Sequence, residues 1–429
     1  MGVSVSSFRL CKIAFAAAVI GIALAPTSAS AQGEEAAVQA PRRQSQAEAL
    51  ALDAGEYARR HGVALDEAMR RLRAQEGTVS ATNRIQQLHA ARLAGVSIEH
   101  APDYRIVVLL TGSEPVAEEI VLGGGMRVPI LFRTGAVATR EQIVAALTRH
   151  QTAIRQAFPE AQGMGLDQRT GELVVLMRDR RPTEVLEPLQ AELEALTGVP
   201  VRVSPVEGAE TNFSVEGGSR LVGVDPADGR RYSCTTGFVV TDGARTGIVT
   251  AAHCPDSATY IGPSGAAVPL DFVGQWGIGY QDVQVHVSAG REGPYFYADA
   301  DKSAVRTLTS WRNRTSTRAG DSVCHRGETT GYSCSEVELT DFSPPGDLCA
   351  GPCDPVWVTV RGPSCRNGDS GGPVFNGTVA FGITKGGNYA SGRCRFYYYM
   401  STDFLPEGWS LLTGRDAAVP AGSARLDRR

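Results

Sequence analysis

Two short segments of the chain carry residues suited to nucleophilic catalysis. One is Thr250-Ala251-Ala252-His253-Cys254, and the other is Gly368-Asp369-Ser370-Gly371-Gly372-Pro373, a serine on a glycine-rich turn. A serine hydroxyl is a poor nucleophile at neutral pH unless a neighbouring imidazole takes its proton. Glycines beside the serine let backbone N–H groups reach a developing oxyanion. The pair predicts acyl transfer, with Ser370 as nucleophile, His253 as base, and the N–H groups of Gly368 and Ser370 as the oxyanion hole.

A third residue must accept a hydrogen bond from the base and hold its tautomer. Asp282 begins the alternating apolar run Asp282-Val283-Gln284-Val285 and lies between His253 and Ser370 in the chain. We therefore expect Asp282 to be the catalytic acid, and His286 on the same run to be structural. Three other acids remain as alternatives that we interpret as surface or turn residues: Asp271, Asp299 and Asp301.

The region that must position these residues is rich in short strands. From about residue 214 the chain is rich in Gly, Ser, Thr, Val and Tyr, and turn residues separate the apolar runs. Many short strands at this spacing indicate an all-β sandwich or barrel. The expected strands are 237–240, 246–251, 283–287, 356–360 and 379–383.

Residues 32 to about 213 contain no cysteine and predict an α+β domain without a catalytic constellation. Residues 46–76 have the composition of exposed helices. Thr139 and Gln142 form an expected capping box before a periodic apolar helix. The expected strands are 105–110, 173–177 and 199–203, the last following a helix that ends at Gly198. We expect surface or cap roles for His61, His89, His100 and His150.

The first 31 residues have the pattern of a secretory signal peptide. Arg9 and Lys12 precede the apolar run 13–25, which is too short to span a bilayer, and Ala29-Ser30-Ala31 is a small-residue cleavage site. No later segment reaches transmembrane length, so we expect a secreted protein, extracellular or periplasmic, without a membrane partner after signal removal. The net charge of −4 gives no indication of a nucleic-acid partner.

Of the nine cysteines, Cys11 lies in the signal and the other eight all follow residue 230. An even set confined to one region of an exported chain predicts disulfides. Zinc is the alternative, because Cys349 and Cys353 are closely spaced, but no histidine is nearby and export favours oxidation. We expect no metal. The eight are Cys234, Cys254, Cys324, Cys334, Cys349, Cys353, Cys365 and Cys394.

With these motifs in order, residues 215 to about 410 resemble the secreted bacterial chymotrypsin-like serine proteases of the streptogrisin and α-lytic protease family. Further matching segments are 215–218, 234–238 and 324–334. The resemblance implies two six-stranded β-barrels with the active site between them. It also implies the disulfides Cys234–Cys254, Cys324–Cys334 and Cys365–Cys394, which leaves Cys349 and Cys353 to pair with each other.

The resemblance further implies a precursor that needs no cofactor. Residues 1–31 would be the signal peptide, 32–213 a propeptide that assists folding and inhibits the enzyme, 214–411 the protease domain and 412–429 a flexible tail. The expected partners are protein or peptide substrates and the chain's own prodomain, and we expect a monomer. A binding protein without catalysis on the same fold is the alternative from another class, and retention of His253, Asp282 and Ser370 argues against it.

Two positions depart from the family pattern. The family has an arginine directly after the first cysteine of the 324–334 segment, where this chain has His325 and then Arg326. We expect Arg326, or charged His325, to neutralise Asp369. The family also has a serine whose hydroxyl supports the catalytic acid; we expect Thr384 to supply this hydroxyl and Lys385 to point outward, because a hydroxyl suits a buried acceptor better than a bulky ammonium does.

Substrate contacts are expected from Thr384, Gly386, Gly387 and Ser364. Trypsin-like enzymes carry an acid two residues before the cysteine of the serine loop, and Pro363 stands there, so cleavage after Arg or Lys is not expected. A cut between Phe213 and Ser214 would fit self-processing after a large apolar residue. The alternative is a preference for acidic residues, with Glu210 as a processing point, if one of three cations reaches the pocket: Lys385, Arg366 or Arg395.

Overall fold

The computed structural model describes residues 42–178, 187–206, 210–212, 220–224, 229, 231–262, 265–277, 279–349 and 351–415. We call 42–206 the upstream region and 220–415 the downstream region. The expected signal peptide, the expected cut after Phe213 and the motif at 215–218 lie outside the described residues. Among the helices that are described, none combines the length and the apolar character needed to cross a bilayer.

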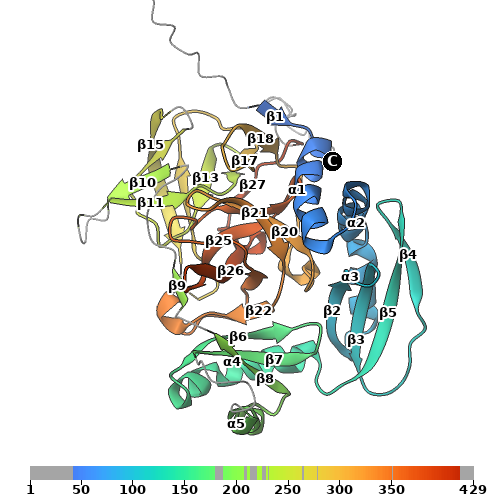
Figure 1. Ribbon diagram of the computed structural model, residues 1–429. Coiled ribbons are helices and arrows are strands. Elements are labelled where there is room, and N and C mark those ends of the chain that lie inside the picture. Colours follow the sequence, from blue (N-terminus) through green and yellow to red (C-terminus); the bar gives the residue numbers. More distant parts are fainter. Residues whose placement is uncertain are drawn as a thin grey trace, which may run out of the picture. The chain divides into compact units, whose positions relative to one another are not determined.

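Three helices and a four-stranded sheet form the first half of the upstream region (Figure 1). The capping box of Ser45 and Glu48 fixes the start of the first helix. Alternating apolar side chains of the sheet, such as Ile106 and Val108, form a buried core. The elements are α1 (Gln46–His61), α2 (Leu65–Gly77), α3 (Val79–Leu88), β2 (Leu93–Glu99), β3 (Arg105–Thr111), β4 (Glu119–Gly123) and β5 (Met126–Ala136), with strand order β2-β3-β5-β4.

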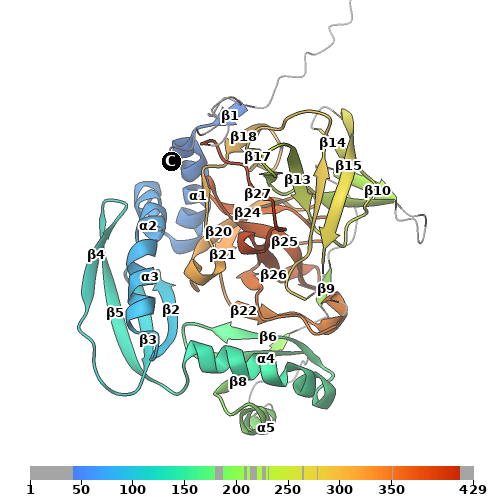
Figure 2. The ribbon, with the colours of Figure 1, turned by 180° about the vertical axis from the view of Figure 1, so that it is seen from behind.

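The second half of the upstream region shares a sheet with the downstream region. The predicted capping box of Thr139 and Gln142 begins α4. The strand order is β22-β6-β7-β8, so a downstream strand, β22, forms one edge of a sheet that upstream strands complete (Figure 2). The elements are α4 (Arg140–Ala157), β6 (Ala161–Asp167), β7 (Glu172–Arg178), α5 (Glu187–Thr197), β8 (Val201–Val206) and β22 (Thr340–Ser343).

An eight-stranded sheet carries the expected base and acid of the downstream region. Its order is β11-β10-β14-β15-β16-β13-β12-β27, and its apolar residues Val249, Val283 and Val285 enter the largest core. The strands are β10 (Arg220–Val224), β11 (Arg231–Thr235), β12 (Val239–Thr241), β13 (Thr246–Thr250), β14 (Ala258–Ile261), β15 (Ala267–Trp276), β16 (Val283–Val287) and β27 (Ser410–Leu411).

A second eight-stranded sheet supports the expected nucleophile. Its main path is β21-β20-β24-β25-β26-β23, and both β19 and β9 pair with β25. Its strands are β9 (Glu210–Asn212), β19 (Ser310–Trp311), β20 (Ser322–Gly327), β21 (Gly331–Glu336), β23 (Val358–Arg361), β24 (Pro373–Asn376), β25 (Val379–Ala390) and β26 (Arg393–Ser401). A small sheet and three 3-10 helices complete the described elements: β1 (Arg42–Gln44), β17 (Tyr295–Tyr297), β18 (Ala304–Thr307), η2 (Arg314–Ser316), η3 (Gly346–Cys349) and η4 (Thr402–Phe404).

Four disulfides join the eight downstream cysteines in the expected pairs: Cys234–Cys254, Cys324–Cys334, Cys349–Cys353 and Cys365–Cys394. Cys324 and Cys334 face each other on the antiparallel strands β20 and β21. The four pairs fit the disulfides expected from the sequence.

Two expectations about exposure were wrong. Residues 46–76 are not simply exposed helices, because Asp53 and Gln75 are each 1% exposed and bond to downstream residues. The expected tail also begins later than residue 412: Leu412 and Thr413 are buried, and the Leu412 N–H donates to the Val239 carbonyl. Residues 416–429 lie outside the described part.

Candidate active site

The expected base and the expected acid lie beside neighbouring strands of one sheet. β13 and β16 are antiparallel, with Thr250 opposite Gln284, so the end of β13 and the start of β16 lie at the same edge. His253 follows β13 and Asp282 precedes β16, and the Cys234–Cys254 disulfide ties down the turn that carries the histidine. This topology brings together two residues that are 29 positions apart in sequence.

His253 lies between a carboxylate and a hydroxyl. Its Nδ1 is 2.7 Å from Asp282 Oδ2, and its Nε2 is 2.8 Å from Ser370 Oγ. The His253 backbone N–H also donates to Asp282 Oδ1 at 3.1 Å. The carboxylate therefore favours the tautomer with a proton on Nδ1, which leaves Nε2 to accept the serine proton.

Ser370 lies in a turn that only glycine can form on its C-terminal side. Gly371 has φ +82°, and a Cβ there would overlap Thr250 Oγ1 and the Thr235 carbonyl oxygen. Thr235 holds the same turn, because its N–H donates to the Ser370 carbonyl at 2.8 Å and its hydroxyl donates to the Gly368 carbonyl at 2.7 Å. Gly368 has φ +97°, again a left-handed conformation. These bonds fix the backbone on both sides of the hydroxyl.

Lys385, rather than Thr384, contacts the acid. Lys385 Nζ is 3.1 Å from Asp282 Oδ2, and the lysine is only 2% exposed. The expectation that Thr384 supplies a hydroxyl and Lys385 points outward is therefore wrong; Thr384 Oγ1 has no hydrogen-bond partner among the described residues. Burial raises the pKa of Asp282, but His253 and Lys385 lower it more, so the pKa lies well below its ordinary value and the carboxylate stays ionised.

Asp369 is held by hydrogen bonds and not by an arginine. Its carboxylate accepts the N–H groups of Thr329, Thr330 and Arg366 and the Thr330 hydroxyl, at 2.8–3.1 Å. Arg326 pairs with Glu328 instead. The expectation that Arg326 neutralises Asp369 is therefore wrong. Burial lowers the pKa of the neighbouring His325, which leaves that imidazole uncharged at neutral pH, so charged His325 does not fill this role either.

The glycines expected to contact substrate already pair with a strand. Residues 210–212 lie antiparallel to β25, with Asn212 opposite Gly386 and Thr211 opposite Gly387. The preceding residue of β25 is Lys385, whose carbonyl is 3.4 Å from Ser370 Oγ. A chain that follows β9 in this register therefore runs toward the serine hydroxyl.

Ser364 lines an open groove of about 730 Å³ beside the Cys365–Cys394 disulfide. Its hydroxyl donates to Ser333 Oγ at 2.7 Å. The groove is also lined by Arg366, Tyr389 and Arg393. Of the three cations proposed to reach a specificity pocket, only Arg366 lines this groove, since Lys385 contacts Asp282 and Arg395 lines a different hollow.

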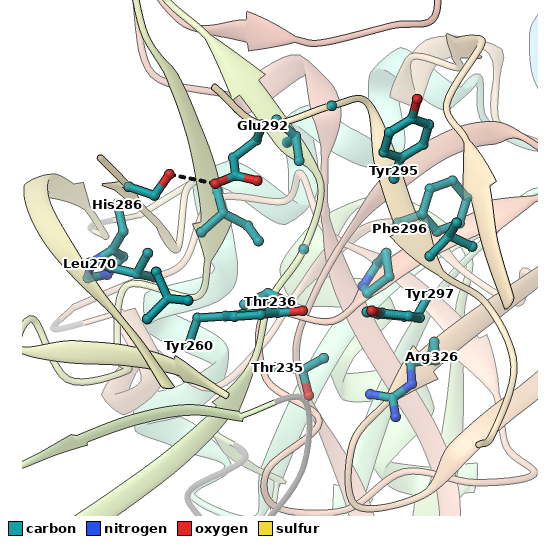
Figure 3. Close-up of a pocket in the computed structure, with 18 residues that line it drawn as sticks. Thr235, Thr236, Tyr260, Leu270, His286, Glu292, Tyr295, Phe296, Tyr297 and Arg326 are labelled. Carbon is teal, nitrogen blue, oxygen red and sulfur yellow. Dashed lines mark hydrogen bonds between the residues drawn. The ribbon is translucent and has the colours of Figure 1, made fainter. Parts of the chain in front are cut away.

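A second cavity, of about 350 Å³, is lined by neither His253 nor Ser370. Figure 3 shows Tyr260, Leu270 and His286 on one side of it, and Phe296, Tyr297 and Arg326 on the other. His286 is fully buried, and its ring nitrogens have no hydrogen-bond partner among the described residues. Burial lowers its pKa to about 4, so it is a neutral core residue, as expected.

The role of Lys385 was among the wrong expectations, and Trp357 was not singled out from the sequence. The ring of Trp357 lies 4.9 Å from Lys385 Nζ and is fully buried. The sequence did contain a sign that Lys385 is buried. It is one of three lysines in the chain, and it lies two residues after the apolar run Phe381-Gly382-Ile383. A lone cation in a strand of the core predicts a buried partner.

Comparisons with known proteins agree with these motifs. No family model matches the chain. Streptogrisin-C of Streptomyces griseus is 28% identical over 185 residues, which are 42% of this chain and 38% of that protein. Similar solved structures include Thermobifida fusca protease A (23% identity, 46% of this chain and 98% of that chain, TM-score 0.37) and Cellulomonas bogoriensis chymotrypsin (20%, 46%, 97%, 0.35). The aligned part is thus less than half of streptogrisin-C. This relative confirms the resemblance to the streptogrisin family that the motifs indicated.

Proposed function

We propose that this protein is a secreted serine endopeptidase with the catalytic triad Ser370, His253 and Asp282. The observation that carries the proposal is the position of one imidazole, with Nε2 2.8 Å from a serine hydroxyl and Nδ1 2.7 Å from a buried carboxylate. A histidine with a structural role would not need a serine hydroxyl on a glycine turn at its second nitrogen. The downstream region would form the two six-stranded β-barrels of the family.

The chemistry needs only groups of the chain and a water molecule. Ser370 Oγ attacks the peptide carbonyl while its proton passes to His253 Nε2, and Asp282 stabilises the imidazolium that results. The N–H groups of Gly368 and Ser370 stabilise the oxyanion. His253 then gives the proton to the leaving amine, and an acyl-enzyme forms. Water hydrolyses this ester by the same proton transfers in reverse, so the protein requires no cofactor.

The upstream region would be the propeptide. Strand β9, just before the expected cut after Phe213, pairs antiparallel with residues 386–388, as a substrate strand does at a sheet edge. The following residue would therefore reach Ser370, which supports self-processing and product-like inhibition by residues 32–213 until they are removed. We further propose that the enzyme acts as a monomer on protein or peptide substrates.

We propose a preference for large apolar residues, since Phe213 would precede the expected cut and no acid is found among the described lining residues of the groove beside Ser364. One observation favours the acid-preferring alternative: Arg366 and Arg393 both line that groove. The Arg366 guanidinium already donates to the Tyr389 hydroxyl at 2.9 Å, which reduces its availability for a substrate carboxylate.

The test is to export the full chain and a Ser370→Ala variant and to sequence the N-terminus of each product. The proposal predicts a start at Ser214 or Val215 in the wild type and an uncut precursor in the variant. An identical start in both would show that another protease makes the cut. An uncut wild type that also fails to react with a fluorophosphonate would favour a binding protein without catalysis.

A further inference from the structure

An ammonium group lies against the carboxylate of the proposed triad. Asp282 Oδ2 is 2.7 Å from His253 Nδ1 and 3.1 Å from Lys385 Nζ, so one oxygen serves both partners. Lys385 is 2% exposed and Asp282 is 3% exposed. On its other side, Nζ is 4.9 Å from the centre of the buried Trp357 ring, a cation–π distance. The cation is therefore enclosed.

The backbone explains why this lysine points inward. In the ladder between β25 and β26, Thr384 is opposite Tyr399 and Gly386 is opposite Tyr398, so Lys385 is an extra residue in a bulge. A bulge interrupts the alternation of side chains and redirects the extra one. At the same position the Lys385 carbonyl lies 3.4 Å from Ser370 Oγ. One residue thus touches both ends of the proposed triad.

A positive charge at this place has two opposite consequences. It stabilises the ionised carboxylate of Asp282, whose burial would otherwise favour protonation. It also disfavours a second positive charge on the adjacent imidazole, which Asp282 alone would stabilise. Among the described residues, the ionisable groups that act on Asp282 are His253 and Lys385, and the other group facing the imidazole is Ser370.

We propose that Lys385 is a positioning residue that orients Asp282 and moves the acidic limb of the pH–activity profile to lower pH. The inference rests on the proposed function. A neutral hydroxyl in its place would orient the carboxylate but would leave the imidazolium better stabilised. We therefore expect the enzyme with the lysine to stay active in more acidic medium than an enzyme with a neutral residue at this position.

The experiment measures kcat/KM against pH for the secreted, processed enzyme and its variants on one peptide substrate. Lys385→Met and Lys385→Ser are the neutral variants, and Lys385→Arg keeps the charge. Lys302→Met is the matched control, because Lys302 pairs with Glu328 outside the proposed triad. We expect the midpoint of the acidic limb to rise by about one pH unit in both neutral variants, and to stay near the wild-type value in Lys385→Arg and Lys302→Met.

If both neutral variants kept the wild-type midpoint of the acidic limb, the inference would be overturned, while the proposed protease function would still stand. An equal shift in Lys385→Arg would also overturn it, since packing and not charge would then be responsible. If neither neutral variant is secreted but Lys385→Arg is active, the requirement for charge is supported; if all three fail, it is contradicted. A wild type without activity at any pH would refute the proposed function itself.

Discussion

Asp53 makes a deeply buried contact between the upstream and downstream regions. Its carboxylate accepts both terminal nitrogens of Arg306 at 2.9 Å, and the Tyr332 hydroxyl and the Gly377 N–H at 2.6 Å each. Asp53 is 1% exposed and Arg306 is fully buried. Asp53→Ala would leave a guanidinium, a hydroxyl and an amide without these partners.

Breaking a buried pair by removing one partner costs about 3–5 kcal/mol, because the other charge stays buried. This corresponds to roughly two to four orders of magnitude in the unfolding equilibrium. We expect that loss in a Ser370→Ala chain, which keeps both regions joined, measured by chemical denaturation followed through intrinsic fluorescence.

The control removes an exposed pair of the upstream region. Glu160 and Arg178 are 2.8 Å apart with side chains about half exposed, so Glu160→Ala should cost less than about 1 kcal/mol. If Asp53→Ala changed the free energy of unfolding no more than Glu160→Ala does, the reasoning that this ion pair anchors the upstream region would be refuted.

Acid should loosen a second contact between the regions, that of His61 with Glu336, because burial and the neighbouring His100 lower the pKa of His61 from 6.5 to about 4. The neutral imidazole is the form that packs against Glu336, so its contribution is complete above pH 6.5 and is lost as the pH falls toward 4. The denaturation midpoint of the Ser370→Ala chain should therefore be lower at pH 4.5 than at pH 7, and His61→Gln should reduce that difference; an unchanged difference would count against the assignment. Gly371→Ala should abolish processing and fluorophosphonate labelling, because the new Cβ overlaps the Thr250 hydroxyl. Gly290→Ala has open space around it and serves as the control, and normal labelling of Gly371→Ala would contradict the geometry of the turn.

The strands of the downstream region could be predicted because their alternation is local. The predicted run 283–287 coincides with β16, and 379–383 lies within β25. The candidates His253, Asp282 and Ser370 were chosen from short motifs, and the structure brings the side chain of the first within hydrogen-bond distance of the other two. The strand expected at 356–360 begins later, at Val358, because Pro355 and Val356 form a turn before the ladder with β26.

Sequence could not predict which charged residues would be buried. The bulge that turns Lys385 toward Asp282 depends on pairing with β26, a partner several residues away, whereas the preference of a buried acceptor for a hydroxyl over an ammonium placed this side chain outside. Asp53 likewise lies in a helix with an ordinary polar composition, and its partner Arg306 is 253 residues away. His61 and His100 also seemed scattered, yet their rings lie 4.4 Å apart between the two regions. Such contacts depend on the tertiary arrangement of distant segments.

The central claim is that Ser370 is a nucleophile activated by His253 and Asp282. The most direct test treats the secreted protein with a fluorophosphonate and locates the adduct by mass spectrometry, in the wild type and in Ser370→Ala, His253→Ala and Asp282→Asn chains. We predict one adduct, on Ser370, in the wild type, none in Ser370→Ala, and labelling slowed by at least about a hundredfold in the other two. Equal labelling rates in the wild type and His253→Ala, or an adduct at another residue, would contradict the account.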